Sequence, residues 1–283
     1  MPTPAETPAD APALQRHLLL LAYNGAGFHG WQSQPNASSV QETVERALST
    51  VMRLPIAIVG AGRTDAGVNA SMMIAHADLP QRVDEPEGGP LVRGLNSLLG
   101  PEVAIRGIRP IHADAHARFD ATERTYRYYA SLRRSPFAHR FSWTASPGLD
   151  FDAMNLAAGQ LLDVEDFTSF SKLHTDTRTN ICHVSRAIWL PVDHSRERPC
   201  DADWMFEISA DRFLRNMVRA VVGTLVDVGR GKLSPEGFAR VIAARDRCAA
   251  STSMPAHALF LHCVAYPYPT FPSVPVKPAP EKP

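Results

Sequence analysis

The chain has 283 residues, of which 45% are apolar, and its 29 lysines and arginines balance its 29 aspartates and glutamates. This length and apolar share are sufficient for a soluble globular protein with one large domain or two of ordinary size. A formal net charge of zero argues against a surface that binds nucleic acid everywhere, so a polyanionic partner must meet a local basic patch.

Cysteine usage and the N-terminal composition indicate the compartment. The cysteines Cys182, Cys200, Cys248 and Cys263 form no C-x-x-C pair, and no histidine spacing completes a zinc site. Free thiols are typical of a reducing cytosol. The apolar run at 18–22 is too short for a signal core or a membrane span. We therefore expect a cytoplasmic protein with no metal and no membrane partner.

Both ends of the chain are rich in proline, which predicts disordered tails at 1–15 and 268–283. The remainder is expected to divide into an N-terminal half, 16–113, and a C-terminal half, 114–267.

The N-terminal half carries strand signals at 17–23, 56–62, 71–79 and 103–111. Helical periodicity follows the capping box of Ser39 and Glu42, and again covers 91–100. The resulting order, β-α-β-β-α-β, is that of a ferredoxin-like unit.

The C-terminal half repeats this order. Strands are predicted at 125–132, 183–192, 203–210 and 257–267, and helices at 151–163, 211–229 and 234–247. The halves share no residue motif, so the repeat depends on element order alone. The sequence thus predicts an α+β protein made of two ferredoxin-like halves.

The loop GAGRTDAGVNA at 60–70 contains three glycines and almost no apolar bulk. Glycines allow a sharp turn and a close approach of a ligand to the backbone. Asp65 at its tip can act as a general base, a nucleophile or a charge stabiliser, although spacing alone favours an Asx turn. The loop matches neither a P-loop nor a dinucleotide fingerprint.

The predicted helix 211–229 carries Arg215 and Arg219 one turn apart on its flank. Arg219 stands among valines, where an arginine either extends to the surface or pairs with a buried carboxylate. Asp65 is one candidate for that carboxylate, although nothing in the sequence connects it with Arg219.

Aromatic and basic residues alternate in ERTYRYYASLRR at 123–134. On a strand, Tyr126 and Tyr128 face one side, and Arg127 and Tyr129 the other. From 106 to 140 the chain has eight arginines against three acidic residues. The pattern suits base stacking and phosphate binding, and equally a sheet with core tyrosines and a solvated charged face.

Taken together, several segments resemble the TruA-type tRNA pseudouridine synthases. The segments are YNGAGFHGWQSQ (23–34), SVQETVERAL (39–48), GAGRTDAGV (60–68), HARFDATERTYRY (116–128), DFTSF (166–170), NMVRAVVGTLVDVG (216–229) and LFLHCVAYP (259–267). The resemblance implies the pseudouridine synthase fold, in which two ferredoxin-like halves share a continuous, mixed and mainly antiparallel sheet. It also implies a homodimer that isomerises uridines 38–40 in the tRNA anticodon stem-loop without metal or cofactor.

The resemblance implies roles for individual residues. Asp65 matches the catalytic aspartate, Arg219 the arginine paired with it through a bidentate fork, and Tyr126 the tyrosine that stacks on the uracil. Residues expected to bind RNA are Arg63, Arg118, Arg124, Arg127 and Arg215. The chain departs from the usual family pattern at Asn24, Asn69 and Asp120.

Two other functions fit the sequence less well. A non-catalytic RNA-binding protein of two ferredoxin-like modules would be expected to carry an RNP1 pattern, which is absent from the strand at 125–132. A hydrolase of nucleoside glycosidic bonds more usually employs two carboxylates, whereas the glycine loop holds one.

Overall fold

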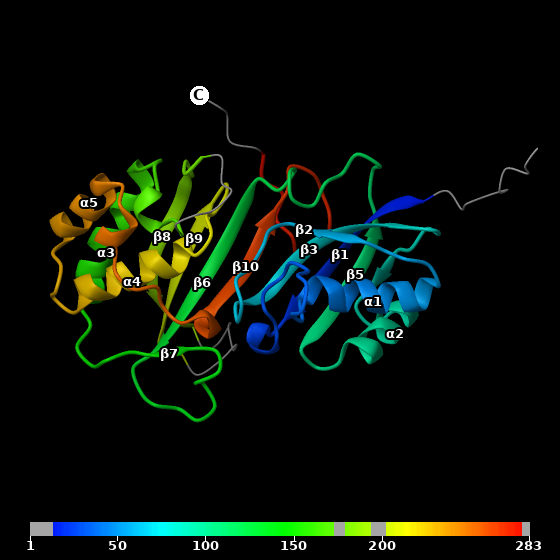
Figure 1. Ribbon diagram of the computed structural model, residues 1–283, viewed down its shortest axis with the longest axis horizontal. Helices are drawn as coiled ribbons and strands as arrows, with labels where there is room; N and C mark the ends of the chain where they lie inside the picture. The colour runs from blue at the N-terminus through cyan, green and yellow to red at the C-terminus, as the bar shows by residue number, and fades with distance from the viewer. Residues whose placement is uncertain (1–13, 173–178, 194–201, 279–283) are drawn as a thin grey trace, which may run out of the picture.

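The computed structural model describes residues 14–172, 179–193 and 202–278. The ends of both expected tails, 1–13 and 279–283, lie outside these residues, as does Cys200. Figure 1 shows an elongated molecule built on one sheet, with α1 and α2 beside the strands of one half and α3 to α5 beside those of the other.

The N-terminal half keeps the predicted order of strands and helices and adds one strand of two residues. The elements are β1 (Gln15–Tyr23), α1 (Val40–Met52), β2 (Ile58–Gly60), β3 (Asn69–Leu79), β4 (Glu85–Pro86), α2 (Pro90–Leu99) and β5 (Val103–Pro110). Ser39 caps α1 as expected, because its hydroxyl accepts the Glu42 backbone N–H at 3.2 Å. Leu18 to Leu21 in β1 are all buried.

The C-terminal half also keeps the predicted order, with short additions. Its elements are β6 (Glu123–Ser131), β7 (Trp143–Thr144), α3 (Phe151–Gly159), β8 (Val184–Pro191), β9 (Trp204–Ala210), α4 (Met217–Gly229), α5 (Pro235–Ala244) and β10 (Leu259–Ala265).

The ten strands of the described residues belong to a single sheet, whose main path is β4-β5-β1-β3-β10-β6-β9-β8. Four strands in each half have the same spatial order, since β5-β1-β3 continues to the three-residue strand β2 just as β10-β6-β9 continues to β8. β10 pairs antiparallel with β6 and parallel with β3, and so joins the halves. The predicted α+β fold with a continuous mixed sheet is confirmed, while the boundary at 113/114 stays a prediction.

The helix predicted at 211–229 begins six residues later, at Met217. Asn216 precedes it with φ of 65° and ψ of 2°, a left-handed conformation that an α-helix cannot contain. Periodicity missed this break because Phe213 and Leu214 continue the apolar pattern. Arg215 therefore lies in the turn before α4, and not on the flank of the helix.

Residues 268–278 are ordered, in contrast to the predicted tail. Phe271 and Val274 are buried at 6% and 5% exposure. The backbone of Val276 forms a parallel bridge with Tyr266, and Lys277 pairs with Glu123 at 2.6 Å. The prolines suggested disorder by composition, but the two buried apolar side chains anchor the segment on the sheet.

Candidate active site

Asp65 lies in the loop between β2 and β3, near the centre of the sheet, with its side chain 25% exposed. Gly67 has φ of +78°, which permits the turn into β3. Within the described residues no backbone N–H donates to the Asp65 carboxylate, so the Asx turn favoured by spacing is absent.

The segment 23–31 supports this loop from one side. Trp31 N donates to Thr64 O at 3.2 Å, and Gly67 N donates to Phe28 O at 3.3 Å. The Tyr23 and Thr64 hydroxyls are 2.9 Å apart. In the sequence, this segment is distinguished only by its resemblance to the family. Its contacts show that it fixes the position of the loop.

Two guanidinium groups from the C-terminal half face the Asp65 carboxylate. Arg219 Nη1 lies 3.8 Å from Asp65 Oδ2, and Arg215 Nε lies 3.7 Å from Asp65 Oδ1. Arg219 Nε donates instead to Met254 O at 2.6 Å, so the expected bidentate fork is not formed. From the sequence, Arg215 was expected to bind RNA, and its contact with Asp65 was not predicted.

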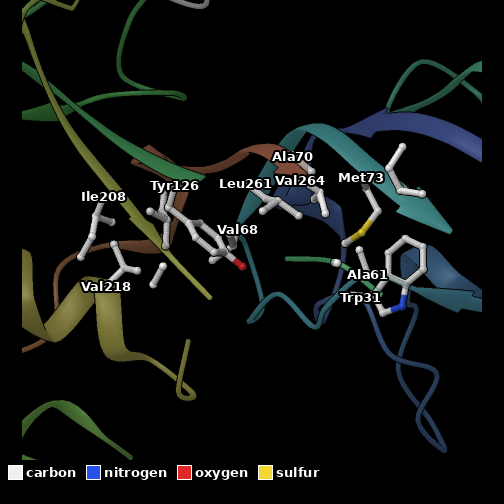
Figure 2. Packing of buried hydrophobic residues seen from close by; sticks show 14 of the residues in the cluster. Trp31, Ala61, Val68, Ala70, Met73, Tyr126, Ile208, Val218, Leu261 and Val264 are labelled. Carbon is white, nitrogen blue, oxygen red and sulfur yellow. The ribbon is translucent and has the colours of Figure 1, made fainter. Parts of the chain in front are cut away.

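Tyr126 on β6 lies beside the same loop. It is 9% exposed and packs edge-to-face on Phe213, with ring centroids 5.0 Å apart. Tyr126 and Val68, three residues after Asp65, belong to the same buried cluster, part of which is drawn in Figure 2. Burial raises the pKa of the Tyr126 phenol, and the negative charge of Asp65 adds to that rise. Tyr126 is therefore a neutral phenol at physiological pH.

Arg63 and Arg118 are exposed, as expected of residues that bind RNA. In the part of the chain that the structure describes, Arg63 has no ion pair and no side-chain hydrogen bond. Arg118 lies with its Cζ 5.9 Å from the centroid of the Phe119 ring. Both cations remain available to a polyanion.

Arg124 and Arg127, also expected to bind RNA, are engaged within the protein. Arg124 donates to four backbone carbonyls, those of Ala61, Arg118, Ala121 and Asp211, at 2.6 to 2.9 Å. Arg127 pairs with Glu207 at 2.7 Å, directly across β6 and β9, where both side chains are 12% exposed. Strand alternation places Arg127 on the face opposite Tyr126. These internal contacts do not support a role of either arginine in RNA binding. The sequence alone does not show which arginines have partners inside the fold.

The three departures from the family pattern all form hydrogen bonds. Asn24 Oδ1 accepts from Ala26 N at 3.1 Å. Asn69 accepts from Gly25 N at 2.9 Å and donates to His257 O at 2.7 Å, so it links the two halves. Asp120 Oδ2 accepts from His116 N at 2.7 Å and from the Tyr268 hydroxyl at 2.6 Å.

Across the described ranges no group of three His, Cys, Asp or Glu residues is placed to hold a metal ion. None of the helices described there is long and apolar enough to cross a membrane.

Comparison with known proteins identifies the family. The sequence model described as "tRNA pseudouridine synthase" matches residues 157–267. The tRNA pseudouridine synthase A of Bacteroides thetaiotaomicron is 52% identical over 254 residues, covering 90% of this chain and 91% of the relative. That of Parabacteroides distasonis is 52% identical over 261 residues, covering 92% and 99%. That of Dechloromonas aromatica is 37% identical, covering 89% and 92%. The chain therefore belongs to the tRNA pseudouridine synthase A family.

Proposed function

We propose that this protein isomerises uridine to pseudouridine in the anticodon stem-loop of tRNA, at positions 38–40, with Asp65 as the catalytic residue. The tRNA substrate follows from the family. The position within tRNA and the role of Asp65 follow from the resemblance of the 60–68 loop to that of the TruA-type enzymes.

One observation carries the proposal: a single partly exposed carboxylate from the N-terminal half faces two guanidinium groups from the C-terminal half. Two cations at 3.7 and 3.8 Å surround this carboxylate with positive charge. The carboxylate also acts electrostatically on the phenol of Tyr126. A carboxylate next to an aromatic ring is what attack on a bound pyrimidine nucleoside requires.

The reaction breaks the bond between N1 and C1′ of uridine, rotates the uracil and joins C5 to C1′. The C5 proton is lost to solvent and N1 gains one, so no oxidant, reductant or energy source is needed. Asp65 can begin it by nucleophilic attack or by removal of a sugar proton, and both routes start from the carboxylate. Tyr126 offers a flat face on which the detached base can turn without being held at one edge.

A uridine within a stem must leave its stack before Asp65 can reach it, at a cost of a few kcal/mol. Arg63 is two residues from Asp65 and is exposed, so we propose that it fills the space left by the flipped base. Arg215 and Arg118 then contact phosphates. The family resemblance further leads us to propose a cytoplasmic homodimer that works without a cofactor.

Replacement of Asp65 by Asn tests the assignment. Asp65→Asn keeps the shape of the side chain but removes its charge, so turnover should fall to background while tRNA binding stays within a few-fold of wild type. The measurement is tritium release from tRNA carrying 5-tritiated uridine, with exposed Asp152→Asn on α3 as the matched control. Retained turnover by Asp65→Asn would falsify the role of this carboxylate.

The same assay separates the alternative functions. A synthase releases tritium from C5, a glycosidic hydrolase frees intact uracil, and an RNA-binding protein does neither.

A further inference from the structure

The most exposed aromatic side chain near the proposed site is Phe119, which is 76% exposed in the loop between β5 and β6. A phenylalanine left in water on a flexible loop would turn inward against apolar surface. Phe119 is instead held outward by its backbone. The Phe119 and Arg118 N–H groups both donate to His116 Nδ1, at 3.2 and 3.1 Å.

The loop that carries Phe119 is tied at both ends. Asp120 Oδ2 accepts from His116 N and from the Tyr268 hydroxyl. Ala117 N donates to His76 Nδ1 at 3.0 Å. These bonds fix the backbone that carries the exposed ring before any ligand arrives, which lowers the entropy lost on binding.

Phe119 ends a short stack of rings. Its ring lies 4.2 Å from that of His116 at an interplanar angle of 26°, and His116 contacts buried His76 edge-on at 4.6 Å. One face of Phe119 is thus backed by the protein, while most of the ring is open to solvent. The Arg118 guanidinium lies over the same ring, with its Cζ 5.9 Å from the ring centroid. An exposed aromatic ring with a cation close to it is an arrangement that stacks a nucleobase and holds its phosphate.

This platform, formed by His116, Arg118 and Phe119, adjoins the Asp65 loop. A single nitrogen of Arg124, Nη2, donates to both Arg118 O and Ala61 O, at 2.6 and 2.9 Å. Arg124 and Tyr126 are two residues apart on β6, so they share a face of the sheet. Asp65 follows Ala61 by four residues, a reach of at most about 14 Å.

We propose that this platform stacks an unpaired base of the tRNA next to the target uridine. The inference rests on the proposed function, because the target is placed at Asp65. A base fits better than a second copy of the chain, since a stable protein interface buries about 800 Å² on each side. The neighbours of Phe119 in the loop, His112, Asp114 and Arg118, are exposed and polar, and do not extend an apolar surface.

The proposal is tested by equilibrium binding of a full-length tRNA substrate. Phe119→Ala should weaken binding about 5- to 160-fold, the range expected for one lost base stack. Phe119→Trp should bind like wild type because it keeps an aromatic face, whereas Phe119→Leu should behave like alanine. The matched control is Phe137→Ala, which removes a ring that is 83% exposed beyond the other end of β6.

A second arm identifies the stacked base. Abasic substitutions are placed one at a time at the unpaired positions of the anticodon loop. At the stacked position, wild type and Phe119→Ala should bind the abasic tRNA equally, because each change removes the same contact.

Three results would overturn the platform: unchanged binding by Phe119→Ala, full rescue by Phe119→Leu, or no abasic position that removes the difference. A shift from dimer to monomer in Phe119→Ala, measured by native mass, would instead show that a second copy covers the ring. All these measurements report binding with Asp65 intact, so they succeed or fail independently of turnover by Asp65→Asn.

Discussion

Replacing Gly25 by alanine tests whether the segment 23–31 positions the Asp65 loop. A Cβ at Gly25 would lie 2.6 Å from the Val68 carbonyl carbon and closer still to its oxygen. Non-bonded carbon atoms rest at about 3.5–4.0 Å, so the two segments must separate by about 1 Å. Gly25 N is bonded to the Asn69 side chain at 2.9 Å, which resists movement of the glycine. Much of the displacement therefore falls on the loop.

A misplacement of about 1 Å at a catalytic group costs about 100-fold in rate. Overpacking of this kind typically costs 1–3 kcal/mol of stability, which a protein of ordinary stability tolerates without unfolding. We therefore expect Gly25→Ala to lower kcat about 100-fold in a folded protein, with tRNA affinity little changed.

The assay is kcat from tritium release, with circular dichroism melting and tRNA affinity measured on the same preparation. Gly27→Ala is the control, because a Cβ there meets no heavy atom within 4 Å and the change lies in the same segment. If the kcat of Gly25→Ala is within two-fold of that of Gly27→Ala, the segment does not position Asp65 and the reasoning fails.

Three further predictions concern stability, each measured by urea unfolding. Arg124→Met removes charged donors from four carbonyls and should cost about 3 kcal/mol or more; a midpoint equal to wild type contradicts that structural role. Phe271→Ala should lower the free energy of unfolding by about 3 kcal/mol if the segment after β10 is packed as described. An unchanged free energy of unfolding would support a disordered tail instead. Burial lowers the pKa of His76 to about 4 from 6.5, so its contribution to stability is present above pH 6.5 and is lost as the pH falls toward 4. Between pH 7 and pH 5, wild type should lose about 2 kcal/mol more than His76→Asn, which cannot titrate; equal slopes refute the shift.

Much of the fold could be predicted from sequence because its signals are local. The capping box at Ser39 and the apolar runs of the long strands are read from neighbouring residues, and both are found in the structure. The predicted start of α4 was wrong because Asn216 has a left-handed backbone conformation, which interrupts the helix. The apolar side-chain pattern continues across this break. The prediction that residues 268–278 are disordered was wrong because composition does not show that Phe271 is buried in the fold.

For the site, sequence pattern singled out the 60–70 loop, and the family resemblance named Asp65, Arg219 and Tyr126. The structure brings these three side chains together, although nothing in their spacing along the chain connects them. Arg124 and Arg127 were indistinguishable from phosphate-binding arginines, because their partners are distant carbonyls and a cross-strand glutamate. The sequence does not distinguish Phe119, because the residue type of an apolar position within a motif does not predict its exposure to solvent.

The placement of β10 between the two halves has a consequence for biosynthesis. Its residues, Leu259–Ala265, are made after every other strand of the sheet, yet they supply the bridge between β3 and β6. A ribosome-bound chain can fold its first half early, but Asp65 and its arginines are not fixed opposite one another until the last strand emerges. Premature termination before Leu259 should therefore yield two unjoined half-sheets with open edges and no assembled site.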